Sequence, residues 1–410
     1  MTTRVRLPHE RLAELWPREL IGCRLGAVVH PASILPDLTH LGDVLRAPGS
    51  PWVLTSLFGP QHGILGHTQD NMIEWEGQAD PRWGVPVHSL YGRVRKPTAP
   101  MLEGLDALLV DLQDIGARYY TFIWTLKLCM EAAWENNLAV VVPDRPNPLG
   151  CTAEGPVLEE GYQSFVGLHT VPVRHGLTMG EMARLLAAEC FPGLKLHVLP
   201  MEGYQASMLW EETRLPWVLP SPNMPTPDTA RVYPGMCLLE ACTASEGRGT
   251  TRPFEIFGAP WIDSLRLKAD LDSLSLPGVI FRELGFQPTF HKGVGRLCGG
   301  VQMHVTDVAS FRPVLTGWAV LWALRRQGAA SEPVDIDPLH PEGLPDIFGW
   351  KAPPYEYEAI KLPIDILAGG SRWRERLDAG ATPLELETEW NRDLPAWRER
   401  ARPHRIYDGF

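Results

Sequence analysis

The chain has 410 residues, a hydrophobic fraction of 44% and a charged fraction of 21%, which are ordinary values for a globular protein of two domains. Its formal net charge of −11 argues against a large phosphate-binding surface, and therefore against a general nucleic-acid-binding protein. The seven cysteines are scattered without a CxxC pair, so the sequence predicts no zinc site, no disulfide framework and no metal or cofactor.

The N-terminal segment carries positive charge but lacks an apolar core of signal-peptide length. No stretch of the chain reaches the length of an apolar transmembrane helix. Scattered cysteines in odd number also fit a reducing compartment. We therefore expect a soluble, cytoplasmic protein, unless an export signal precedes this start.

Four short apolar runs in the first half of the chain predict strands that are buried on both faces of a parallel sheet. Residues 119–136 are long enough for a crossover helix between the last two strands. A second helix is expected at 178–190, where Thr178 can serve as N-cap with Glu181 three residues later. This alternation predicts a doubly wound, Rossmann-like α/β sheet. The four runs are residues 24–30, 52–58, 107–111 and 139–142.

The second half of the chain has a different character, which begins after the proline-rich segment 221–226. Residues 301–306 alternate like a half-exposed strand, and a helix is expected at 311–326. We place the boundary near Asp228, which gives an N-terminal domain of residues 1–228 and a smaller α/β domain of residues 229–410. The last forty residues look helical and offer three tryptophans as docking anchors: Trp373, Trp390 and Trp397.

Polar side chains follow three of the predicted strands, where a parallel sheet presents its carboxyl edge. Ligands of open α/β sheets bind beyond this edge. Any one loop alone would be explained by helix caps and turns, but the three together favour a ligand cleft. The polar residues are Gln61 and His62 in the first loop, Gln113, Asp114 and Arg118 in the second, and Asp144, Arg145 and Asn147 in the third.

These residue types suit a sugar, because amides and carboxylates bond to hydroxyl groups and glycosidic cleavage needs a positioned acid. Arg118 or Arg145 could bind an anionic group of a substrate bidentately. Equally, either arginine could pair with Asp114 or Asp144 and hold the loops in place. The sequence leaves both roles open.

Two further segments are candidates for the same site. Glu154 begins a Glu-Gly-Pro sequence shortly after the third loop, and His175 follows an apolar run. Residues 245–253 form a charged segment rich in glycine and hydroxyl groups, which is either a ligand-binding loop or a surface loop with screened ion pairs. An isolated histidine such as His175 is either a ligand contact or a structural residue.

The motifs of several other enzyme classes are absent. The chain has no GxGxxG sequence after a strand, no GxxxxGK[ST], no HExxH and no GxSxG. These absences count against a nucleotide-binding enzyme, a zinc protease and a lipase-type hydrolase.

An ordered set of motifs resembles the NamZ-type exo-N-acetylmuramidase family, over residues 22–407. The resemblance implies an active site in the cleft between a Rossmann-like domain and a smaller α/β domain. It also implies that the substrate is a small carbohydrate and that N-acetylmuramic acid is released from the non-reducing end of peptidoglycan fragments, without a nucleic-acid or membrane partner. The motifs lie at residues 58–63, 89–98, 111–118, 144–148, 154–156, 221–226 and 245–253.

The chain departs from the family pattern at Gln61, where relatives often carry a glutamate that is a leading catalytic candidate. An amide cannot donate a proton as an acid or act as a carboxylate base. The acid must then come from elsewhere, and Asp70 and Glu74 lie nearby in sequence. The ranked candidates for catalysis are Glu154, Asp114, Glu246 and Glu74. Glu154 comes first because Gly155 and Pro156 would hold it on a defined turn.

The predicted substrate contacts come from the three loops and the family motifs. The lactyl carboxylate of muramic acid is expected to meet an arginine, with Arg118, Arg145 and Arg252 as candidates. The full set of predicted contacts is Gln61, His62, Gln113, Arg118, Asp144, Arg145, Asn147, His175, Asn223, Arg248 and Arg252.

Two other functions remain in competition with hydrolysis. Gln61 favours a non-catalytic relative that binds muropeptides or sugars in the same cleft. An enzyme of another class, such as a phosphosugar transferase, is disfavoured because phosphate-binding glycine motifs are missing.

Overall fold

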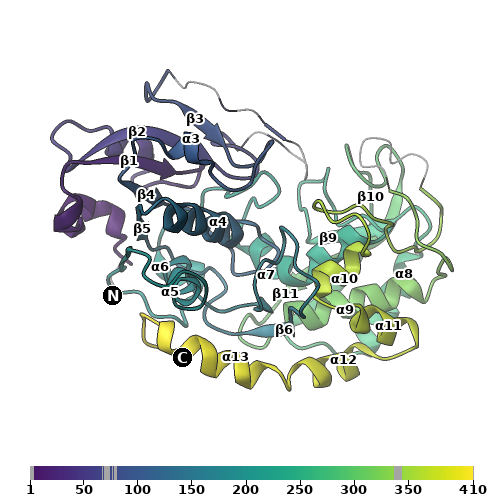
Figure 1. Ribbon diagram of the computed structural model, residues 1–410. Helices are drawn as coiled ribbons and strands as arrows, with labels where there is room; N and C mark the ends of the chain where they lie inside the picture. Colours follow the sequence, from purple (N-terminus) through teal and green to yellow (C-terminus); the bar gives the residue numbers. More distant parts are fainter. Residues whose placement is uncertain are drawn as a thin grey trace.

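Six strands form one parallel sheet in the N-terminal half of the chain, drawn on the left of Figure 1. The computed structural model describes residues 4–66, 68, 74–75, 77, 81–336 and 344–409. The sheet order is β3-β2-β1-β4-β5-β8, and every neighbouring pair is parallel. The predicted doubly wound sheet is therefore confirmed. Its strands are β1 (Cys23–Val28), β2 (Trp52–Gly59), β3 (Val87–Ser89), β4 (Ala107–Val110), β5 (Ala139–Pro143) and β8 (Leu196–Leu199).

The central strands are apolar throughout because both faces of the sheet are covered. Along β4, Leu108 and Val110 pack into the core that contains α4 and α5, whereas Ala107 and Leu109 pack against the N-terminal helices on the other face. The Thr178 capping box at the start of α5 is present as expected. The helices of this half are α1 (Leu12–Leu15), α2 (Leu41–Leu45), α3 (Ala99–Leu102), α4 (Phe122–Glu135), α5 (Met179–Cys190) and α6 (Trp210–Thr213), with 3₁₀ helices at Pro8–Arg11 and Arg18–Leu20.

A smaller antiparallel sheet of order β10-β11-β9 forms the centre of the C-terminal half. The predicted strand and helix of this half correspond to β11 and α9. Asp228 lies in the first turn of α7, and a domain boundary there stays a prediction. The elements are α7 (Pro227–Met236), the 3₁₀ helix η3 (Cys237–Ala241), β9 (Ile256–Ala259), α8 (Ser264–Ser273), β10 (Val279–Phe286), β11 (Cys298–Val305) and α9 (Pro313–Arg325).

The C-terminal helices run back along the lower side of the molecule to the parallel sheet, as Figure 1 shows. Trp373, Trp390 and Trp397 are buried, so the predicted docking anchors are confirmed. The Tyr407 hydroxyl donates to Asp144 Oδ2 at 2.7 Å, which ties the end of the chain to the sheet. The elements are α10 (Pro363–Ala368), α11 (Ser371–Asp378), α12 (Pro383–Trp390), α13 (Leu394–Ala401) and a 3₁₀ helix at Arg402–His404.

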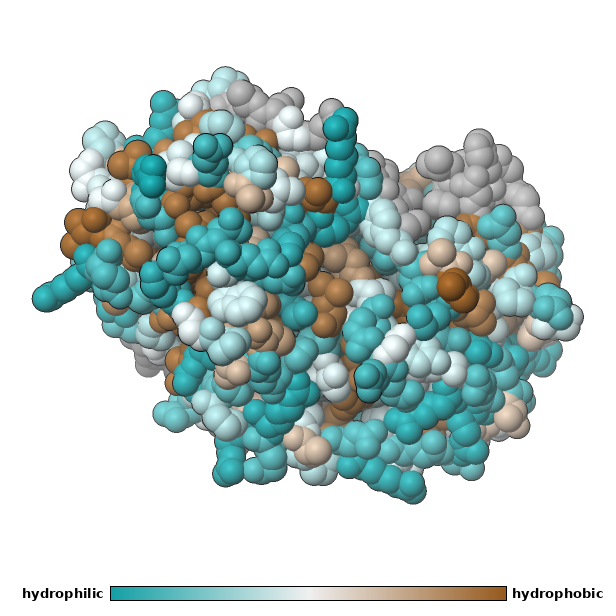
Figure 2. Space-filling model, viewed as in Figure 1, coloured by the Kyte–Doolittle hydropathy of each residue, from teal (hydrophilic) through white to brown (hydrophobic). Residues whose placement is uncertain are grey.

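A two-stranded antiparallel ribbon of β6 (Glu154–Val157) and β7 (Pro172–Arg174) lies beside these helices. The expectation that Glu154 lies on a turn is wrong, because this residue begins β6 and pairs with Arg174. None of the helices in the described ranges combines the length and hydrophobicity needed to cross a membrane. Figure 2 shows a mostly hydrophilic face with hydrophobic residues interspersed over both halves.

Candidate active site

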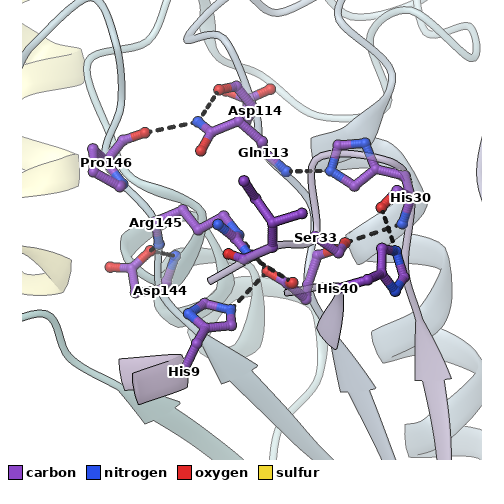
Figure 3. Close-up of polar contacts among 12 residues, drawn as sticks. His9, His30, Ser33, His40, Gln113, Asp114, Asp144, Arg145 and Pro146 are labelled. Atoms are coloured by element: carbon purple, nitrogen blue, oxygen red, sulfur yellow. Dashed lines mark hydrogen bonds and ion pairs between the residues drawn. The ribbon is translucent and has the colours of Figure 1, made fainter. Parts of the chain in front are cut away.

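The carboxyl edge of the parallel sheet is filled by its own side chains, which bond to one another in Figure 3. Arg145 binds Asp111 through Nε and Nη2, at 2.5 and 2.8 Å, and His9 Nε2 lies 3.0 Å from Asp111 Oδ1. Burial opposes the ionisation of Asp111, but the charge of Arg145 and the contact with His9 hold its pKa well below the usual range. These bonds favour the second of the two roles considered for Arg145, in which it pairs with an aspartate and holds the loops in place.

Three more of the predicted contacts hold the loops at this edge. Asp144 Oδ1 accepts the backbone N–H of Gly180 at 2.7 Å, and burial raises the pKa of Asp144 to about 6. Gln113 Nε2 donates to the Pro146 carbonyl at 2.9 Å, as Figure 3 shows. Asn147 Nδ2 donates to the Leu177 carbonyl at 2.9 Å. These polar groups satisfy backbone groups that burial would otherwise leave unbonded.

The two remaining candidates for binding the lactyl carboxylate, Arg118 and Arg252, also have bonding partners within the protein. Arg118 is fully buried and donates to three backbone carbonyls, those of Pro156, Val171 and Leu367, at 2.7 to 3.0 Å. Arg252 is half-exposed and pairs with Glu255 at 3.1 Å.

A pocket lies between the two halves of the chain, where the loops after β2 and β4 meet the C-terminal half. Four of the predicted contacts line it, namely Gln61, His62, Asn223 and Arg248. His62 has a left-handed backbone with φ of 68°, which is uncommon for a non-glycine residue and is enriched at functional sites. The other polar residues of the lining include Tyr119, Tyr120, Thr121, Ser221, Tyr233, Glu240, Tyr355 and Glu356.

Two buried carboxyl groups face this pocket from the C-terminal half. Glu240, on η3, accepts hydrogen bonds from Arg248 Nη2 and from the Tyr355 hydroxyl, both at 2.7 Å. Glu356 accepts a bond from the Tyr91 hydroxyl at 3.2 Å and is only 2% exposed. The pocket thus holds two different carboxyl groups: Glu240 is in an ion pair with an arginine, whereas Glu356 accepts a hydrogen bond from the neutral hydroxyl of a tyrosine.

The two carboxyl groups interact through their charges. Burial raises the pKa of Glu356 to about 7, and the negative charge of Glu240 acts in the same direction. The Tyr91 hydroxyl and the charges of Arg95 and Lys351 act in the opposite direction without reversing the shift. Glu356 is therefore protonated to a large extent at neutral pH, beside the ion pair of Glu240.

Family models for the N-terminal and C-terminal parts of exo-beta-N-acetylmuramidase NamZ match residues 25–228 and 231–407. The chain belongs to the NamZ family. It is 40% identical over 395 residues to the peptidoglycan beta-N-acetylmuramidase NamZ of Bacillus subtilis (strain 168), covering 96% of this chain and 89% of that protein.

Two crystal structures from Bacteroides fragilis NCTC 9343, both of DUF1343 family proteins, share the fold. One is 32% identical with a TM-score of 0.84, and the match covers 99% of each chain. The other is 23% identical with a TM-score of 0.73, and the match covers 100% of each chain. This likeness supports the fold alone.

The leading sequence candidate, Glu154, lies outside the pocket lining in this NamZ-family chain. Its Oε1 accepts the backbone N–H groups of Val314 and Leu315, at 2.9 and 3.1 Å, and so caps the N-terminus of α9. Burial raises the pKa of Glu154 to about 7, although Arg174 and these two bonds act in the opposite direction. Its pKa alone would suit an acid, but its bonds are those of a helix cap.

Asp114 and Glu246 also lie apart from the pocket lining. Asp114 Oδ2 accepts the Gly116 N–H at 2.7 Å and lies 3.2 Å from His175 Nε2, so these two predicted residues meet each other. Burial opposes the ionisation of Glu246, but the charges of Lys292 at 2.7 Å and His291 at 3.1 Å hold its pKa well below the usual range.

The fourth candidate, Glu74, is exposed and accepts a bond from the Tyr357 hydroxyl at 3.1 Å. Asp70, considered with it in the sequence, lies outside the described residues.

The sequence interpretation missed Glu240 and Glu356. Each carried a weak signal: Glu240 is a single charge in an otherwise apolar run, and Glu356 is flanked by two tyrosines. A buried carboxyl group with a raised pKa is a candidate for catalysis.

Proposed function

We propose that this chain is an exo-acting β-N-acetylmuramidase, which releases N-acetylmuramic acid from the non-reducing end of peptidoglycan fragments. The observation that carries the proposal is the buried pair of Glu240 and Glu356 in a pocket lined by both halves. The relative from Bacillus subtilis, a peptidoglycan beta-N-acetylmuramidase, supports the same reaction.

The two carboxyl groups suit the two roles that glycoside hydrolysis requires. Glu356 is the proton donor, because burial raises its pKa to about 7 and so leaves a large fraction of it protonated at neutral pH. It transfers its proton to the glycosidic oxygen as the bond to the anomeric carbon breaks. Glu240, ion-paired with Arg248, supplies negative charge for the positive charge that develops on the sugar. Water then adds its oxygen to the anomeric carbon and gives up a proton to the Glu356 carboxylate, which restores the acid.

The remaining pocket residues fit a role in binding. The Thr121 hydroxyl donates to Gln61 Oε1 at 2.7 Å, and this bond orients the amide so that its NH₂ group can donate to a sugar oxygen. Among the predicted arginines, Arg248 is the one that lines the pocket, so we assign the lactyl carboxylate to Arg248, which would bind this group in addition to Glu240. Asn223 and the tyrosines supply further hydrogen-bonding groups.

Wild-type protein incubated with the disaccharide of N-acetylmuramic acid β-linked to N-acetylglucosamine should release both sugars, which chromatography would detect. The competing function is sugar binding without hydrolysis, and Gln61 is the residue that favours it. Binding of the disaccharide without cleavage, together with a gain of cleavage in Gln61→Glu, would establish that alternative. Cleavage of the disaccharide by the wild-type protein, which carries Gln61, would exclude sugar binding without hydrolysis.

We expect kcat/KM for the disaccharide to fall as the pH rises above about 7, because Glu356 must be protonated to act as the acid. Lys351 lowers the pKa of Glu356, so Lys351→Met should move this limb of the profile to higher pH. Glu240 raises the same pKa, so Glu240→Gln should move the ionisation of Glu356 to lower pH, as followed by carboxyl ¹³C NMR. Shifts of the same sign in both variants would contradict the assignment.

We also propose that the chain acts in the cytoplasm on imported fragments during cell-wall recycling. All seven cysteines are free, which fits a reducing compartment. Fractionation of cells that express the full-length gene would test this location.

A further inference from the structure

An exposed aromatic side chain stands directly beside the acid of the pocket. Tyr357 is 56% exposed, whereas its neighbour Glu356 is 2% exposed and lines the pocket. Both residues have left-handed backbones, with φ of 68° and 45°, and two successive non-glycine residues in this conformation are unusual. The backbone here thus places one side chain in the pocket and the next in solvent.

The ring of Tyr357 is fixed although it is exposed. Its hydroxyl donates to Glu74 Oε1 at 3.1 Å, and the Arg95 guanidinium carbon lies 4.2 Å from the ring centroid. The same guanidinium carbon lies 4.2 Å from the centroid of Tyr91. The Tyr91 hydroxyl in turn bonds to Glu356, so one run of contacts connects the exposed ring to the acid.

The chemistry of hydrolysis decides which sugar would lie near this ring. A general acid protonates the glycosidic oxygen, so it lies on the side of the leaving group, and the departing sugar is attached to the protonated oxygen itself. Consecutive Cα atoms are about 3.8 Å apart, so a side chain that follows the acid and turns toward solvent can meet a sugar that extends out of the pocket. An oriented aromatic ring presents a flat apolar surface to the C–H face of a pyranose.

We propose that Tyr357 forms the binding site for the leaving-group sugar, by stacking on the pyranose ring that is linked to N-acetylmuramic acid. This inference rests on the proposed hydrolase function and extends it to a second sugar position. It accounts for an aromatic side chain that is held on two sides while much of its surface remains open to solvent.

The experiment compares two substrates that share the muramic acid part. One is the disaccharide with N-acetylglucosamine as leaving group, and the other is β-N-acetylmuraminyl fluoride, whose leaving group is a single atom. Tyr357→Ala should lower kcat/KM for the disaccharide by about tenfold, equivalent to ~1.4 kcal/mol, with a much smaller loss for the fluoride. Tyr357→Phe, which keeps the ring, should recover most of the loss.

The control is Ile360→Ala, which changes an 85%-exposed side chain of the same segment and should leave both rates unchanged. An equal loss for both substrates in Tyr357→Ala would overturn the proposal, because the ring would then act on a part of the reaction that does not involve the leaving-group sugar. A ring that acts only by positioning Glu356 would spare the fluoride too, but it would leave the binding of N-acetylglucosamine unchanged, and that result would also overturn the proposal. An undiminished rate for the disaccharide would overturn it as well.

A binding measurement separates this proposal from the hydrolase function. Free N-acetylglucosamine should show saturation transfer from wild-type protein and from Tyr357→Phe, and a clearly weaker effect from Tyr357→Ala. If wild type hydrolyses neither substrate but this pattern appears, the hydrolase function fails and the sugar site stands. If binding of N-acetylglucosamine is the same in all three proteins, the sugar site is overturned whatever the hydrolytic activity.

Discussion

Replacing Glu356 with glutamine should lower kcat/KM for the disaccharide by about 10² to 10⁴-fold, the usual contribution of a general acid. Glutamine keeps the shape of the side chain and can still accept a bond from Tyr91, but it has no proton to transfer to the leaving oxygen. The loss should therefore appear mainly in kcat, as measured by release of N-acetylmuramic acid under steady-state conditions.

The leaving group provides the internal check on this assignment. β-N-acetylmuraminyl fluoride needs little protonation, so Glu356→Gln should retain far more of its activity on the fluoride than on the disaccharide. Glu358→Gln is the matched control, because it makes the same change two residues away and removes a surface ion pair with Lys361. Equal losses on both substrates, or a similar loss in Glu358→Gln, would show that Glu356 is not the acid.

The fold could be predicted from the sequence because its strands are buried on both faces. Continuous apolar runs such as residues 107–110 are typical of buried parallel strands when they alternate with helical segments. The short edge strand β3 and the ribbon of β6 and β7 are harder to predict, since three or four residues give little periodicity. The sequence around Glu154 predicts a turn because the glycine and proline after it are also typical of turns.

The candidate site could be predicted only in part, because polar residues after a strand look the same whether they bind a ligand or the backbone. Asp144 and Asn147 hold loops, whereas Gln61 and His62 line the pocket. The difference depends on which partners the fold brings near, and Arg145 meets a residue 34 positions earlier in the chain. Glu240 and Glu356 escape sequence reasoning because they are separated by more than a hundred residues and line one pocket only after folding.

Arg145→Met should destabilise the protein by about 3–5 kcal/mol, because the variant leaves Asp111 buried without its main partner. His9 would remain beside Asp111, but its own pKa is lowered by burial, so it replaces the lost charge poorly. The free energy of unfolding from urea denaturation measures the effect. Arg24→Met is the matched control, because Arg24 also binds an aspartate through two nitrogens, at the surface.

The surface pair of Arg24 and Asp106 should contribute far less to the free energy of unfolding, since both side chains are largely solvated. Similar losses in the two variants would contradict the structural role of Arg145. The same experiment decides between the two roles that the sequence leaves open for this residue. If Arg145 holds the loops, KM for the disaccharide stays near wild type at a temperature where the variant is folded. A large rise in KM with unchanged stability would instead make Arg145 a substrate contact.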